Sequence, residues 1–162
     1  MRRVLILCAL TAALAVPAAA LAFAATPADG TLAVRNAAGD PGQVVVGLNV
    51  TGAVVGKVDA GRMLIDDVGG PDTLAPVVTG AERTRDLPSG ATLYSGTDLR
   101  FRAVGGHYKV RILGRGIDVN VVGQGTARLT GSIALPSDGR YSVNGGPWAS
   151  LPDFGETVRI GG

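Results

Sequence analysis

The sequence is poor in the residues on which thiol and metal chemistry depend. Of its 162 residues, one is cysteine (Cys8) and one is histidine (His107). Because Cys8 lies in the N-terminal apolar run, the rest of the chain has no disulfide and no reactive thiol. A single histidine excludes a His/Cys metal cluster within one chain. We therefore expect a domain that is stabilised by packing alone and holds no cofactor.

Aromatic residues and net charge are also scarce. Aromatic residues make up 4% of the chain, which leaves few side chains to stack on sugars. Without Arg2 and Arg3, which belong to the N-terminal segment, the 15 basic residues become 13, equal to the 13 acidic ones. This balance excludes a domain-wide field for nucleic acid but is compatible with a local basic patch.

The N-terminus has the pattern of an export signal. Two arginines precede an apolar run from Val4 to Val16, Pro17 ends the run, and Ala22-Phe23-Ala24 offers small residues to a signal peptidase. This order predicts a signal peptide over residues 1–24 with cleavage before Ala25. The alternative is an uncleaved membrane anchor, since an apolar segment of this length can span a bilayer. In both cases we expect a secreted or extracytoplasmic protein associated with the cell envelope, with a membrane as partner only if the segment is uncleaved.

Beyond residue 30, short β-rich runs alternate with glycine, proline and aspartate. The 25 glycines favour tight turns and bulges over helices. The pattern predicts a single all-β domain over residues 25–162, a small sandwich or closed barrel of mostly antiparallel strands after an N-terminal signal helix. The expected strands span 31–36, 43–48, 53–58, 62–66, 98–104, 107–113, 117–122, 126–131, 140–143 and 156–160.

The middle of the chain divides this pattern. Residues 67–96 are rich in glycine and proline and predict a long connection with one or two irregular strands. A shift of 67 residues aligns Leu32 with Leu99, and Val54-Val55-Gly56 with Val121-Val122-Gly123. Matching glycines at turns and apolar residues in strands predict an internal duplication, in which two related four-strand halves share one core.

A hairpin is expected at Gly105-Gly106, because two glycines supply the positive φ of a two-residue turn. That turn would place Arg102 opposite Lys109 and Arg100 opposite Arg111. The core face would carry Leu99, Phe101, Ala103, Tyr108, Val110 and Ile112. The other face would carry Arg100, Arg102, His107, Lys109 and Arg111. Opposed like charges cost up to about 1 kcal/mol per pair, so we interpret these five residues as a candidate anion-binding strip. The alternative is a solvated face, in which carboxylates from a neighbouring strand interleave with the cations, with Asp118 and Asp98 as candidates.

Two weaker candidates remain. Asp66, Asp67 and Asp72 lie in a glycine-rich loop and could offer oxygen ligands to a hard cation such as Ca²⁺. Aspartates also simply form turns, which is the alternative interpretation. Trp148 either packs over the edge of the core or is an exposed aromatic side chain for a glycan or a protein partner.

No catalytic motif is present, so the chain is not expected to be an enzyme. His107 would lie among cations, which makes it a poor general base. We expect an exported, non-catalytic β domain that acts by binding or as a structural module, with an anionic envelope polymer or another envelope protein as partner and no nucleic acid. The alternative is a secreted hydrolase with dispersed carboxylates. A cleft with converging Asp or Glu side chains would distinguish the two.

Overall fold

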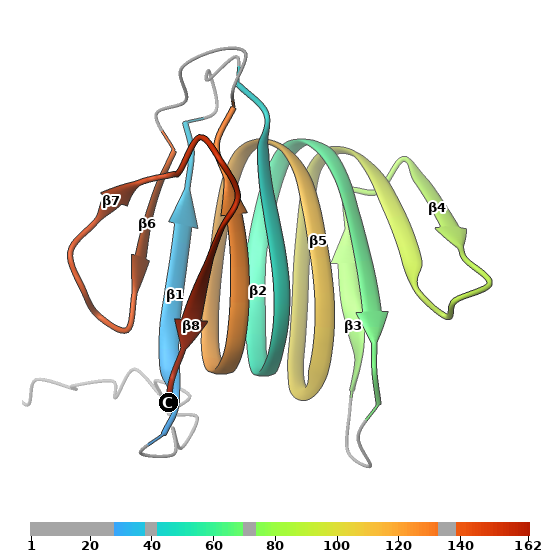
Figure 1. Cartoon of the computed structure of the whole chain (residues 1–162). Helices are drawn as coiled ribbons and strands as arrows, with labels where there is room; N and C mark the ends of the chain where they lie inside the picture. The colour runs from blue at the N-terminus through green and yellow to red at the C-terminus, as the bar shows by residue number, and fades with distance from the viewer. Residues whose placement is uncertain (1–27, 38–41, 70–73, 133–138) are drawn as a thin grey trace, which may run out of the picture.

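The computed structural model describes residues 28–37, 42–69, 74–132 and 139–162 (Figure 1). Within these residues the regular structure is entirely antiparallel β, which confirms the predicted class. The predicted signal peptide and its helix lie outside the described residues. Among the described residues, no helix has the length and hydropathy needed to cross a bilayer. The strands are β1 (Gly30–Arg35), β2 (Val44–Asp67), β3 (Leu74–Thr79), β4 (Arg83–Asp86), β5 (Thr92–Thr130), β6 (Arg140–Val143), β7 (Ala149–Ser150) and β8 (Glu156–Ile160).

Two of these strands are much longer than predicted. Seven of the ten expected runs are consecutive parts of β2 and β5, which have 24 and 39 residues. The remaining three correspond to β1, β6 and β8. The connection expected between residues 67 and 96 contains β3 and β4, which both pair with β5.

β2 and β5 wind around each other as a flattened antiparallel coil (Figure 1). Val110 of β5, for example, pairs with Leu48 on one edge and with Ile65 on the other. Successive passes of β2 beside the same β5 segment are therefore 17 residues apart. The ribbons arch over one edge of the coil and turn back at the other, so each turn contributes one segment to each of two layers.

The register defines these two layers. Layer I consists of β3, residues 97–104 of β5, 53–58 of β2, 117–123 of β5, then β1, β6 and β7. Layer II consists of β4, residues 92–95 of β5, 61–67 of β2, 107–114 of β5, 44–51 of β2, 124–130 of β5, and β8. Side chains that point between the layers form one core, whose largest fully buried members include Tyr108, Leu32, Met63, Leu99, Ile112, Ile117 and Leu129.

The sheet is not closed, so the closed-barrel alternative is wrong. β2 and β5 run through both layers, and the architecture does not divide into two four-strand halves. The internal duplication therefore stays a prediction without support from the fold.

Rows of glycine mark the places where the strands turn from one layer to the other. At each edge of the coil, glycines of neighbouring strand passes are direct register partners. The rows comprise Gly30, Gly123, Gly52 and Gly106 at one edge, and Gly114, Gly61 and Gly96 at the other. A strand can bend sharply at these positions because no side chains compete for the inside of the bend.

The prediction of a hairpin at Gly105-Gly106 is wrong. The chain does not reverse there; it crosses from layer I to layer II, and Gly106 pairs with Gly52 of β2. Arg102 consequently lies opposite Val55 rather than Lys109. Gly105 has a positive φ of 81°, which is compatible with a bend as well as with a turn. Pairing with β2 provides the backbone hydrogen bonds on both sides of the bend. The predicted core face is confirmed, since Leu99, Phe101, Ala103, Tyr108, Val110 and Ile112 are all buried.

The buried Tyr108 gives the domain a sensitivity to alkaline pH. Burial raises the pKa of its phenol above the ordinary value of 10.0, and the negative charge of Asp67 raises it further. Its hydroxyl donates a hydrogen bond to the carbonyl oxygen of Val104, at 2.9 Å. The folded state thus holds this proton more tightly than the unfolded state, so its contribution is complete below the unfolded pKa and is lost as pH rises through the folded pKa.

We expect Tyr108→Phe to flatten the fall in stability above about pH 10, the unfolded pKa of tyrosine. At neutral pH the variant should be about 1 kcal/mol less stable, because one hydrogen bond is lost. Urea unfolding at a series of pH values measures both effects, with the half-buried Tyr141→Phe as control. An alkaline limb equally steep in wild type and Tyr108→Phe would show that another group is responsible.

Candidate ligand-binding site

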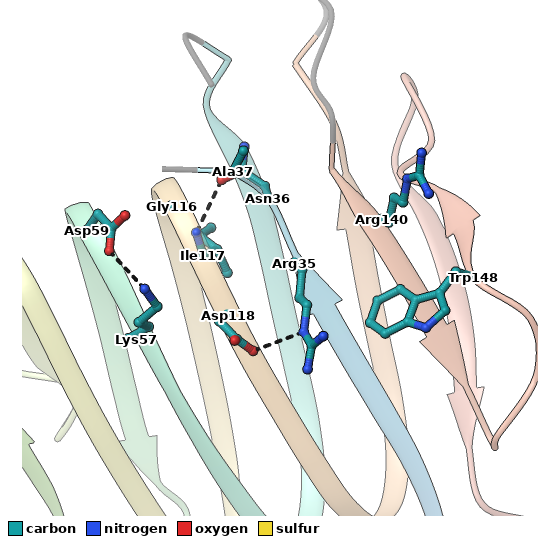
Figure 2. Close-up of a pocket in the computed structure, with 10 residues that line it drawn as sticks. All are labelled: Arg35, Asn36, Ala37, Lys57, Asp59, Gly116, Ile117, Asp118, Arg140 and Trp148. Atoms are coloured by element: carbon teal, nitrogen blue, oxygen red, sulfur yellow. Dashed lines mark hydrogen bonds and ion pairs between the residues drawn. The ribbon is translucent and has the colours of Figure 1, made fainter. Parts of the chain in front are cut away.

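A pocket of about 460 Å³ opens on layer I, at the edge of the coil marked by Gly114, Gly61 and Gly96 (Figure 2). It lies between β1, β6, the segment before β7 and the bends of β2 and β5. Six of its ten lining residues are polar or charged, and both signs of charge are present. The lining residues are Arg35, Asn36, Ala37, Lys57, Asp59, Gly116, Ile117, Asp118, Arg140 and Trp148.

Four charged side chains of the pocket come from one row across neighbouring strands. Arg35 of β1 pairs in register with Arg140 of β6 on one side and with Asp118 of β5 on the other. Asp118 in turn pairs with Lys57 of β2. Direct register partners project on the same side of a sheet, so the alternation that buries Leu32 and Val34 brings these four charges together outside layer I.

Ion pairs and a ring contact fix most of this row in place. Arg35 Nε lies 3.5 Å from Asp118 Oδ1, and Lys57 Nζ lies 3.5 Å from Asp59 Oδ1. The guanidinium carbon of Arg35 is 5.2 Å from the centre of the Trp148 ring, within range of a cation–π interaction. Exposed ion pairs contribute about 0–1 kcal/mol, so their main effect here is to orient the side chains.

The rim of the pocket is tied to the backbone through Asn36. Its main-chain N–H donates to the carbonyl oxygen of Ile117 at 2.9 Å, and its side-chain Oδ1 accepts from the N–H of Ile117 at 3.2 Å. Gly116 beside it has a φ of 61°, and a Cβ there would collide with the carboxylate of Asp59. Glycine at this position therefore allows the Asp59 side chain to lie across the bend.

Two groups at the mouth of the pocket stay available to a ligand. Trp148 is 46% exposed, so it does not pack into the core. Arg140 forms no ion pair with any other described residue. An exposed indole beside a cation, with carboxylates held on the far side, can accept a sugar ring that carries a negative group.

The structure does not bring the five residues of the predicted anion strip together. Arg100 and Arg102 lie on the outer side of layer I, whereas Lys109 and Arg111 lie on the outer side of layer II. The bend at Gly105-Gly106 separates the two pairs.

Local partners also differ from those expected in the strip. Arg100 pairs with Asp98 at 3.2 Å, so a carboxylate interleaves with this cation as the alternative interpretation proposed. A ring nitrogen of His107 lies 2.6 Å from Asn49 Oδ1, on the neighbouring pass of β2.

The three aspartates considered for a cation are also placed differently. Asp66 lines a groove on layer II, while Asp67 Oδ1 accepts a hydrogen bond from the N–H of Gly69 at 3.3 Å. Asp72 lies outside the described residues. Within the part of the chain that the structure describes, no three His, Cys, Asp or Glu side chains are grouped closely enough to hold a metal ion.

Comparison of the chain with protein-family models, with curated proteins and with solved structures gives no match. The site is therefore interpreted from its own geometry. Of the residues around this pocket, the sequence draws attention to Trp148 and Asp118 but not to Arg35, Lys57 or Arg140. The only available signal was the outward position of each in an alternating strand, and that signal does not indicate which strands are neighbours.

Proposed function

We propose that this chain is an exported, non-catalytic β domain that binds an acidic saccharide of the cell envelope in the pocket of layer I. The observation that carries the proposal is that the half-exposed Trp148 lines the same pocket as Arg140, which forms no ion pair with any other described residue. The apolar face of a sugar ring stacks on an indole, and a sugar carboxylate takes a bidentate contact from arginine. Asp118 and Asp59, held by their cations, accept hydrogen bonds from sugar hydroxyls.

Export is part of the proposal and rests on the N-terminal sequence. The two arginines, the apolar run to Val16 and the Ala22-Phe23-Ala24 site support removal of residues 1–24. The mature domain would then be secreted or extracytoplasmic and held at the envelope by its polymer ligand. If the segment is not cleaved, it would anchor the domain to the membrane beside the same ligand.

The alternative, a secreted hydrolase, has one observation in its favour: Asp59 and Asp118 line the same pocket. Glycosidases use such a pair, and one member is kept protonated by apolar surroundings. Here each carboxylate lies 3.5 Å from a cation, Lys57 or Arg35. Neither is in the surroundings of a general acid, so we rank binding above hydrolysis.

Calorimetric titration with short oligogalacturonates tests the proposal. We expect wild type to bind, and Trp148→Ala and Arg140→Gln each to weaken binding by about tenfold or more, as for central aromatic and arginine contacts. Phe154→Ala is the matched control, because Phe154 is 79% exposed and does not line the pocket.

Three results would contradict the proposal. Wild type could fail to bind any oligouronate, or Phe154→Ala could weaken binding as much as Trp148→Ala. Alternatively, the oligosaccharide could be shortened during incubation by wild type but not by Asp118→Asn. This last result would establish the hydrolase instead.

A further inference from the structure

A larger groove, of about 740 Å³, crosses the outer face of layer II. Its lining includes Gly47 of β2, which pairs in register with Arg111 on one side and Arg128 on the other. Neighbouring strands are about 4.8 Å apart, so the backbones of the two strands that carry these arginines are about 10 Å apart. Between them glycine provides no side chain, which leaves an open trough across the strands.

The groove has more positive than negative side chains. Lys109 lines it beside Arg111 and Arg128, and Asp66 is the one carboxylate among its lining residues. Within the described residues, all three ion pairs lie in layer I or at its bends: Arg35–Asp118, Lys57–Asp59 and Arg100–Asp98. Lys109, Arg111 and Arg128 therefore form no ion pair with another described residue, although Asp66 is the register partner of Lys109.

One of these cations, Arg128, lies close to the backbone of a neighbouring segment. A Cβ at Gly155 would lie 2.7 Å from Arg128 Nη2, so the guanidinium rests directly against the chain that leads into β8.

Charged, polar and aliphatic side chains line the groove. It contains no aromatic residue, and its remaining polar lining includes Asn49, Ser89, Thr126, Thr130 and Thr157. It also lies on layer II, whereas the Trp148 pocket lies on layer I, so the two sites face opposite sides of the molecule.

We propose that the groove binds a second stretch of linear carboxylated polysaccharide, so that one molecule bridges two polymer chains. This inference rests on the proposed function of the layer I pocket. In this arrangement the pocket binds one acidic sugar unit of one polysaccharide chain, and the groove binds the regularly spaced carboxylates of a second chain.

Gly47→Phe tests the groove without straining the backbone. The nearest atoms to a Cβ at residue 47 are 3.7 Å and 3.8 Å away, both in Arg128, and the φ of Gly47 is not positive. The ring should fill the trough and leave the fold intact. A second variant, Lys109→Gln/Arg111→Gln, removes charge instead of space. Its matched control is Arg83→Gln/Arg85→Gln, which removes the same charge from exposed positions of β4.

Two measurements separate the sites. Light scattering of mixtures with long polygalacturonate should report cross-linking by wild type and by the β4 control. Both groove variants should lose at least about nine-tenths of this signal and keep wild-type affinity for a short oligogalacturonate. Trp148→Ala should lose affinity for the oligosaccharide. Bridging should also fall as salt is raised, because exposed charges are screened.

The possible failures are distinct. If wild type binds the oligosaccharide but does not cross-link the polymer, or if the groove variants cross-link normally, the bridging inference is wrong and the proposed function stands. If the β4 control loses cross-linking as well, net charge rather than the groove is responsible, and the inference is again wrong. If wild type binds no uronate at all, both fail.

Discussion

Replacing Gly123 with alanine is expected to lower the free energy of unfolding by about 2–6 kcal/mol, which for a domain of this size can prevent folding. Gly123 has a φ of 147°, a region that is essentially restricted to glycine. A Cβ there would collide with the carbonyl oxygen of Thr51 and lie 3.0 Å from the Cα of Gly52, its partner in the glycine row. The backbone strain and the collision with main-chain atoms add, because neither a rotamer change nor a side-chain shift relieves them. Urea unfolding of the purified variant measures the loss.

Other glycines separate these two causes. Gly105 has a φ of 81° but open space around its Cα, so Gly105→Ala should cost only the conformational term, about 1–2 kcal/mol. Gly61 has no positive φ, yet a Cβ there would collide with the carbonyl oxygen of Leu113. The substitution Gly61→Ala therefore measures the steric cost alone. Gly47→Ala should be close to neutral. If Gly123→Ala costs no more than Gly105→Ala, the close packing of the glycine rows does not support the bends.

The glycine rows also explain which parts of the fold could be predicted from the sequence. Alternation of apolar and polar residues is a local property, so it correctly predicted the all-β class, β6 and β8, and the buried face that includes Leu99 and Tyr108. A glycine pair, in contrast, permits either a reversal or a bend. Which of the two forms at Gly105-Gly106 depends on pairing with β2, about fifty residues away in the chain.

The candidate site could not be predicted from the sequence for the same reason. Its charged row comes from β1, β2, β5 and β6, and these segments become neighbours only through the coil. Each of its side chains, taken alone, resembles an ordinary exposed residue in a strand. Local pattern therefore identifies which residues point outward, and the long-range register decides which of them form a site.

Asn144, in the turn between β6 and β7, connects segments of both layers at the end of the coil. Its φ is 51°, and Gly145 after it has a φ of 71°. The side-chain Oδ1 accepts from the N–H of Gly161 at 3.0 Å and of Thr31 at 3.3 Å, and Nδ2 donates to the carbonyl oxygen of Arg159 at 3.2 Å. One side chain thus ties β1 of layer I to the chain around the end of β8 in layer II.

Asn144→Ala should accordingly lower the free energy of unfolding by about 2–4 kcal/mol: three hydrogen bonds of about 1 kcal/mol each, and a positive φ that alanine resists. Asn144→Gly keeps the backbone conformation and loses only the side-chain bonds, so it should recover about 1 kcal/mol of that loss. Asn144→Asp retains both acceptor contacts and should be the mildest of the three. Hydrogen exchange at the amides of Thr31 and Gly161 localises the effect, because both should lose protection in Asn144→Ala and Asn144→Gly while β2 keeps its own. If those two amides stay protected and all three variants unfold at the wild-type urea concentration, the side chain does not join the layers, and packing of Ile160 in the core is what holds β8.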